Sequence, residues 1–196
     1  MTDALKRAAQ IFERSPISME RAGRHFETLA KYYSSFPDWS LALLYYKKAW
    51  ETFKKANDGR TPFVHVEIAK ALCNLVRYKE AGEIFEQVAD NHLARNESQF
   101  IVSPSVFAAL MCRVFTNDWA GLQSKMDLFS SKYPFFVELD EYVFVSHLLE
   151  HHDDLDNQEV LKAINRFQKN FFGDSWIQEG LKKLALKLES SEVSYL

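Results

Sequence analysis

Four segments of the sequence decide the fold: DWSLALLYYKKAW at 38–50, RYKEAGEIFEQVA at 77–89, NDWAGLQSKMDLF at 117–129 and NQEVLKAINRFQK at 157–169. In each, apolar residues recur at intervals of three and four, which is the spacing of one helical face. A small or branched residue recurs at Ala42, Ala81, Ala120 and Val160, in steps of 39, 39 and 40. A period of this length fits one helical hairpin, so the sequence predicts a row of stacked hairpins.

Residues that start or stop helices mark the boundaries of these hairpins. Asp38 and Asp118 are suited to cap helix N-termini, Pro62 fits a first helical position, and Pro16 and Pro134 separate helices. The pattern predicts ten helices, at about 3–14, 18–33, 39–56, 61–75, 78–93, 104–115, 119–133, 140–153, 157–170 and 175–190. The sixth is expected to begin at Pro104, because proline removes a backbone donor.

We therefore predict an all-α fold, an α-α superhelix of about five antiparallel hairpins like those of tetratricopeptide repeats (TPRs). We expect one domain over residues 1–196, with repeat hairpins in 1–133 and a C-terminal helical bundle in 134–196. The alternative is a helical bundle without a repeat. A content of 47% hydrophobic residues is enough for a core, and the six glycines and five prolines are too few for a protein rich in β-turns.

Charge and cysteine content exclude several classes of function. The formal net charge of −3, with both signs interspersed, predicts no nucleic-acid partner. Cys73 and Cys112 lie in apolar helical patterns, so we expect reduced core residues of an intracellular protein. No apolar run is long enough for a signal peptide or a membrane span, so we expect a soluble chain in the cytoplasm.

Several motifs together resemble the soluble NSF attachment protein (SNAP) family. SKYPFF at 131–136, LLE at 148–150 and Trp176 carry the resemblance from Asn117 onward. EIAKALCNLVRYKEAGEIFEQV at 67–88 and LAKYYSSFPDWSLALLYYKKAWETF at 29–53 look like two further hairpins of that family. The resemblance covers this whole chain but only about the C-terminal two thirds of a full-length family member.

The resemblance implies an adaptor without catalytic residues or cofactors. Family members lay a concave, basic face along a SNARE four-helix bundle, and their C-terminal end docks onto the AAA+ ATPase NSF, which unwinds the bundle. The N-terminal hairpins that touch membranes in the family have no counterpart here. We therefore expect the chain to be peripheral at membranes only through its partners.

Two candidate surfaces follow from this resemblance. The partner-binding residues would be the local concentration of basic side chains, Arg21, Arg24, Lys31, Lys47, Lys48, Lys54 and Lys55. The alternative is a solvated helix face whose lysine stems cover apolar surface. The tail that contacts the ATPase would be Glu189, Glu192, Tyr195 and Leu196.

A second interpretation keeps the fold but changes the partner. Where the family has lysines facing the SNARE bundle, this chain has Glu67 and Ala109, and Tyr195 is next to last where the family has leucine. These differences favour a TPR-like scaffold that binds another protein. The two interpretations differ in whether the chain binds a SNARE bundle.

The segment HLLEHHDDLD at 147–156 is the one cluster that suggests a metal or an enzyme. His147 and His151 are one helical turn apart, so both could reach one ion. The residue directly after His147 is Leu148 and not the glutamate that HExxH needs, and the family resemblance continues through this turn. We therefore favour a solvated helix end with no metal, and the absence of GxxxxGK[ST], GxGxxG and GxSxG motifs favours a protein that is not an enzyme.

Overall fold

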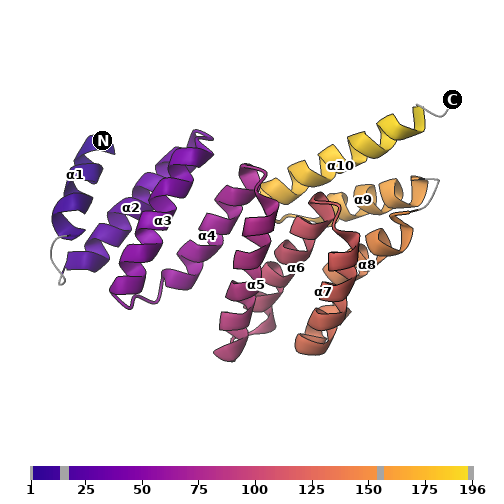
Figure 1. Cartoon of the computed structure of the whole chain (residues 1–196), viewed down its shortest axis with the longest axis horizontal. Coiled ribbons are helices and arrows are strands. Elements are labelled where there is room, and N and C mark those ends of the chain that lie inside the picture. Colours follow the sequence, from indigo (N-terminus) through magenta and orange to yellow (C-terminus); the bar gives the residue numbers. More distant parts are fainter. Residues whose placement is uncertain (1, 14–17, 154–156, 194–196) are drawn as a thin grey trace. The chain divides into compact units, whose positions relative to one another are not determined.

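The computed structural model describes residues 2–13, 18–153 and 157–193. These residues form ten α-helices and one short 3-10 helix, paired in chain order as antiparallel neighbours (Figure 1). The all-α fold of TPR-like hairpins is therefore confirmed. The chain divides into two compact units, Met1–Asn91 and His92–Leu196. No helix among the described residues is both long and apolar enough to cross a membrane.

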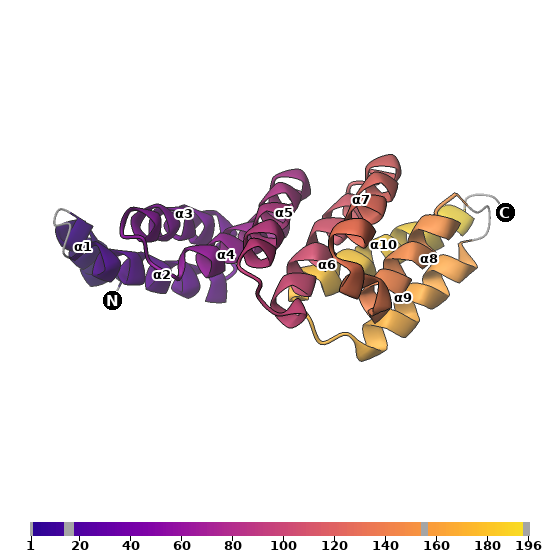
Figure 2. The ribbon, with the colours of Figure 1, turned by 90° about the horizontal axis from the view of Figure 1, so that it is seen from below.

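The first unit holds α1 (Thr2–Glu13), α2 (Met19–Ser35), α3 (Trp39–Lys55), α4 (Thr61–Asn74) and most of α5 (Tyr78–Ala94). Helix α2 packs against α1 on one side and α3 on the other, and α3 packs in turn on α4. Figure 2 shows α3 lying over α2 in this unit. Buried aromatic side chains fill the space between these two helices, with the rings of Phe26 and Tyr45 stacked at 6.4 Å.

The second unit holds α6 (Gln99–Phe115), α7 (Trp119–Lys132), the 3-10 helix η2 (Pro134–Glu138), α8 (Asp140–His151), α9 (Gln158–Asn170) and α10 (Ser175–Val193). Helix α10 returns to pack on both α6 and α9. Tyr133 and Phe136, from the SKYPFF motif, are fully buried where η2 packs on α7 and α8. The 3-10 helix itself was not anticipated from the sequence.

Four turns between helices share one backbone geometry, in which the second residue after the helix has a positive φ of 52 to 62°. The residues are Asn57, Val76, Asn96 and Asn117. The next N–H in each turn donates to the carbonyl five residues back, as Asp58 does to Phe53 at 2.9 Å. This is the Schellman motif, which satisfies the last carbonyls of a helix and reverses the chain within a few residues.

The first backbone hydrogen bonds of every second helix show that the predicted repeat must be corrected. In α3, α5, α7 and α9 the first such bond runs to the carbonyl of the cap residue from the amide of Ala42, Ala81, Leu122 and Leu161, respectively. The cap residues are therefore 38, 77, 118 and 157, which are 39, 41 and 39 residues apart. The equivalence of Ala120 and Val160 with Ala42 and Ala81 was therefore wrong, and Ala120 is exposed. The reason is that α6 has 17 residues where α4 has 14, while the connection before α6 is one residue shorter.

The prediction that the sixth helix begins at Pro104 was also wrong, because α6 begins at Gln99 and continues through the proline. Proline removes the amide that would donate to the carbonyl of Phe100 one turn earlier. Pro104 and Phe100 are both exposed, so water can satisfy that carbonyl. The helix therefore tolerates a proline that the sequence pattern treats as a boundary.

Two glycines lie directly against an aromatic ring of a neighbouring helix. A Cβ at Gly23 of α2 would stand 2.5 Å from Cε1 of Phe53 on α3, and a Cβ at Gly180 of α10 would overlap the ring of Phe115 on α6. The predicted small residue at Ala81 is also fully buried. Close approach of the helix axes thus depends on residues without a side chain or with only a methyl group.

The contact between Gly23 and Phe53 predicts an unusual sign for a helical substitution. In an open helix Gly→Ala stabilises by about 1 kcal/mol. We expect Gly23→Ala to lower the free energy of unfolding by about 1 to 3 kcal/mol, because the new methyl group must displace the Phe53 ring. Urea denaturation measures the change.

The matched control is Gly59→Ala, because no atom lies within 4 Å of a Cβ at Gly59. This control is expected to be neutral or slightly stabilising. Equal stabilities for the two variants would show that the helices do not need glycine at this contact.

Candidate partner-binding surfaces

The four candidate lysines of α3 form one exposed face of that helix. The face contains one acidic residue, Glu51, which lies between the two pairs of lysines, Lys47 with Lys48 and Lys54 with Lys55. In the part of the chain that the structure describes, none of these four lysines forms an ion pair with a carboxylate. The face therefore carries a net positive charge that is not cancelled by direct pairing.

Two of these lysines rest on aromatic rings. The Nζ of Lys48 is 5.6 Å from the ring centre of Phe26, and the Nζ of Lys54 is 4.8 Å from that of Trp50. The aliphatic stems thus cover apolar surface while the ammonium groups stay in water. Holding the ammonium groups in place reduces the conformational entropy that a charged partner has to remove on binding.

The three candidate residues of α2 lie on a surface of mixed charge. Arg24 pairs with Glu20, and the Nζ of Lys31 is 2.5 Å from Oε1 of Glu27. Arg21 is exposed on the same side of the helix. This α2 strip therefore alternates in sign along its length, which weakens its attraction for an acidic partner.

The α2 strip and the α3 face each lie on the side of their own helix that is opposite to its buried residues. The buried side of α2, which includes Phe26, Leu29 and Ala30, packs on its neighbours, and the strip lies on the opposite side. Helix α3 likewise buries Ala42, Tyr45 and Ala49 and exposes its lysines. The seven basic residues thus fall into two groups, one on the exposed side of each helix.

An ion-pair network ties the turn between α3 and α4 to the start of α2. The Nη2 of Arg60 is 2.7 Å from Oδ2 of Asp58 and 3.0 Å from Oε1 of Glu20. Hydrogen bonds from Arg60 lower the pKa of Asp58. The guanidinium also lies over the ring of Phe53, 4.4 Å from its centre. This network supports the fold, and Glu20 is shared between Arg24 and Arg60.

Two residues that suggested a changed partner have different environments. Ala109 is only 1% exposed in the core of α6, so it cannot contact a partner and its lack of charge says nothing about binding. The argument from Ala109 was therefore wrong. Glu67 is half-buried on α4, with its Oε1 3.5 Å from the Nζ of Lys70, so it remains a real difference in charge at the surface.

The second unit has an open groove that the sequence analysis missed. It lies between α8 and α9, and its floor is made by Phe144, Phe167 and Phe171. The rings of Phe144 and Phe167 are stacked 4.0 Å apart. Acidic side chains at its rim include Glu138 and Glu141. The spacing of apolar residues in α8 and α9 does indicate that these phenylalanines lie on the inner faces of the two helices. It does not indicate that no other helix covers them.

The candidate tail is described only at its beginning. Glu189 is exposed on α10. Tyr195 and Leu196 lie outside the described residues, and so does the side chain of Glu192. The helix that leads to the tail is anchored by Trp176 and Leu181, which are buried, while Leu184 and Leu188 are half-buried.

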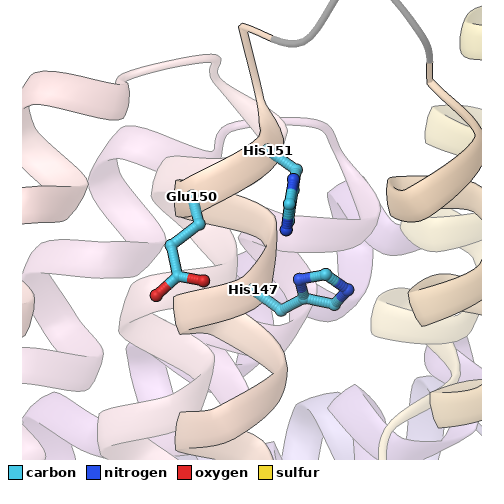
Figure 3. Close-up of side chains that lie close together, drawn as sticks. All are labelled: His147, Glu150 and His151. Carbon is cyan, nitrogen blue, oxygen red and sulfur yellow. The ribbon is translucent and has the colours of Figure 1, made fainter.

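The histidines near the end of α8 divide into two sets. His152 stacks on Trp119 with ring centres 4.6 Å apart, and its Nδ1 is 2.7 Å from the carbonyl of Leu149. His147 and His151 instead lie together on one side of α8, with ring centres 4.4 Å apart (Figure 3). Asp154 and Asp156 of the same segment lie outside the described residues.

Comparison with known proteins now decides the family. The family model described as soluble NSF attachment protein, SNAP, matches residues 1–188. The chain belongs to this family. Soluble NSF attachment proteins are adaptors without enzymatic activity, in agreement with the expectation that the chain is not an enzyme.

The relatives of this SNAP-family chain are distant and longer. Beta-soluble NSF attachment protein of Bos taurus is 23% identical over 92% of this chain and 54% of its own length. Alpha-soluble NSF attachment protein of Vitis vinifera is 21% identical over 88% and 60%, and vesicular-fusion protein SEC17 of Komagataella phaffii is 23% identical over 88% and 60%. The chain thus spans little more than half the length of these relatives.

A titratable group at the edge of the α3 face gives a prediction for pH. The ring of His65 on α4 stacks on Trp50 at 4.9 Å. Burial, and to a lesser extent the charge of Lys54, lowers the pKa of His65. The unfolded chain binds a proton here at about pH 6.5 while the folded chain resists it, so stability is full above that pH and falls as pH falls towards the folded pKa.

We expect His65→Phe to flatten this part of the pH dependence, because phenylalanine keeps the stacked ring and cannot be protonated. Urea denaturation at pH values of about 7.5 and about 5.5 measures the effect. The variant His25→Phe, in which the histidine stacked on Phe12 is replaced, controls for the ring exchange itself. An unchanged loss of stability in His65→Phe would assign the pH dependence to other groups.

Proposed function

We propose that the chain is an adaptor that binds an acidic helical bundle of the SNARE type and couples it to an NSF-type AAA+ ATPase. Family membership supports the class of function, and the relatives' names state attachment to NSF. The exposed lysines of α3 are the observation that carries the choice of an acidic partner. The C-terminal unit, with its tail, is then the part that contacts the ATPase.

The α3 face is favoured over the α2 strip because of its charge. Four lysines and one glutamate give a net attraction for a bundle that exposes carboxylates. The α2 strip balances each of Arg24 and Lys31 with a glutamate one turn before it. Charge of this kind raises the association rate more than it strengthens the final contact.

Two double charge reversals test this choice. We expect Lys47→Glu with Lys55→Glu to lower the association rate with an assembled SNARE four-helix bundle about tenfold at low salt. The difference should shrink as ionic strength rises, because salt screens exposed charges. Surface plasmon resonance at two salt concentrations measures both effects.

The matched control is Arg21→Glu with Lys31→Glu, which changes the net charge by the same amount but on the exposed side of α2. The control should bind nearly as fast as the parent. If the control loses binding and the α3 variant does not, the binding surface is the α2 strip. Neither pair of substitutions removes Lys48 or Lys54, whose ring contacts support the fold.

The tail is tested by deleting residues 193–196. We expect the truncated chain to keep its circular dichroism spectrum and its affinity for the SNARE bundle, because the buried anchors Trp176 and Leu181 remain. Stimulation of ATP hydrolysis by NSF should fall, because the contact with the ATPase is lost. Equal stimulation by both forms would place that contact elsewhere in the C-terminal unit.

The full-length chain decides between the two interpretations of function. If it neither binds a SNARE bundle nor stimulates NSF, the adaptor proposal fails. The half-buried charge of Glu67 would then favour a TPR-like scaffold with a different protein partner.

A further inference from the structure

The end of α8 brings together three side chains that can bind a metal ion. Ligand atoms of His147, Glu150 and His151 all lie within 4.8 Å of one another. Figure 3 shows the two imidazoles on one side of the helix and Glu150 on the adjoining side. Residues three and four positions apart on a helix are neighbours on its surface, so the backbone itself sets this proximity.

The imidazole pair is held in a partly protected place. Both histidines are half-buried, and their rings meet edge to face with centres 4.4 Å apart. His147 also lines the groove between α8 and α9. Partial burial limits the rotamers of the rings, which lowers the entropy lost when both bind one ion.

A further acidic group lies on the neighbouring helix. Glu159, in the first turn of α9, bonds mainly to Lys162, whose Nζ is 2.7 Å from its Oε1. That hydrogen bond and the charge of Lys162 lower the pKa of Glu159, and His147 and His151 add to the effect. Helix α9, which carries Glu159, packs on α8, which carries both imidazoles.

We infer that His147, His151 and Glu150 form a binding site for a divalent first-row transition ion, with Zn²⁺ as the natural candidate. Two imidazole nitrogens and one carboxylate oxygen suit zinc, whereas Mg²⁺ and Ca²⁺ prefer oxygen ligands alone. Ligands at about 2.0 to 2.2 Å from zinc require modest rotation of the three side chains. Water completes the tetrahedron, and Glu159 stabilises the cation through space.

This site would be additional to the binding of SNARE bundles and does not rest on it. The sequence favoured a solvated helix end because Glu150 does not stand at the HExxH position, directly after the first histidine. The structure adds a third ligand one turn along and an acidic group from α9. A cation bound to the three side chains of α8 would also attract the carboxylate of Glu159 on α9. This attraction would strengthen the packing of α8 on α9.

The test uses the full chain without a histidine tag, treated with a chelator and titrated with Co²⁺ and then Zn²⁺. We expect visible absorption bands typical of tetrahedral Co²⁺, which Zn²⁺ abolishes by displacement. Isothermal titration calorimetry gives the affinity for Zn²⁺ directly. Absence of both the absorption and the heat of binding would overturn the proposal.

Substitutions assign the ligands. His147→Ala and His151→Ala should each weaken Zn²⁺ binding by about tenfold or more, and Glu150→Gln should weaken it less. Glu159→Gln should have a smaller effect than Glu150→Gln, since it acts without direct contact. If Glu159→Gln weakens binding as much as the histidine variants while Glu150→Gln has no effect, the proposed ligand set is wrong.

The matched control is His152→Gln, because His152 is next in sequence but stacks on Trp119. This variant should keep the Co²⁺ spectrum and the affinity of the parent. Circular dichroism checks the folding of each variant, and Zn²⁺ should raise the thermal midpoint only in those that keep both His147 and His151. Equal binding by the parent and the His147→Ala variant would place the ion elsewhere and overturn the proposal.

Discussion

The arrangement of each unit depends on helices that approach so closely that a glycine must lie under an aromatic ring. The ring of Phe53 occupies the space where Gly23 would have a Cβ, and the ring of Phe115 does the same over Gly180. The first contact sets α2 against α3 and leaves the lysines of α3 and the mixed charges of α2 on the exposed sides of the two helices. The second brings α10, and with it the beginning of the tail, back onto α6.

Local chemistry made most of the helix boundaries predictable. Asp38 and Asp118 cap their helices by accepting from the amides of Leu41 and Gly121, as their residue types suggest. The exact period of the repeat was not predictable in the same way. The extra residues in α6 shift the register of α7, and nothing in the sequence around Ala120 indicates that shift. Spacing shows which residues share a face of one helix, but it does not show how that face lies relative to the next helix.

That limit applies equally to the candidate surfaces. Seven basic residues on successive helices look alike in the sequence, and only the structure shows that Arg24 and Lys31 are paired with glutamates. Ala109 shows the converse, because a position that seemed to report on a partner is part of the core. The family and its general adaptor role could be recognised from motifs such as SKYPFF, whose Tyr133 and Phe136 turn out to be fully buried. Charge at the surface is less constrained than packing, so partner contacts are harder to predict.

The turn between α6 and α7 makes Asp118 serve two helices at once. Its amide donates to the carbonyl of Arg113 and closes α6, while its carboxylate accepts from the amide of Gly121 and opens α7. The same carboxylate also binds the guanidinium of Arg113, at 2.6 Å. Fraying at the end of one helix therefore exposes unsatisfied groups at the start of the other. Adjacent helix ends should open together, so that the hairpin and not the single helix is the smallest unit of local unfolding.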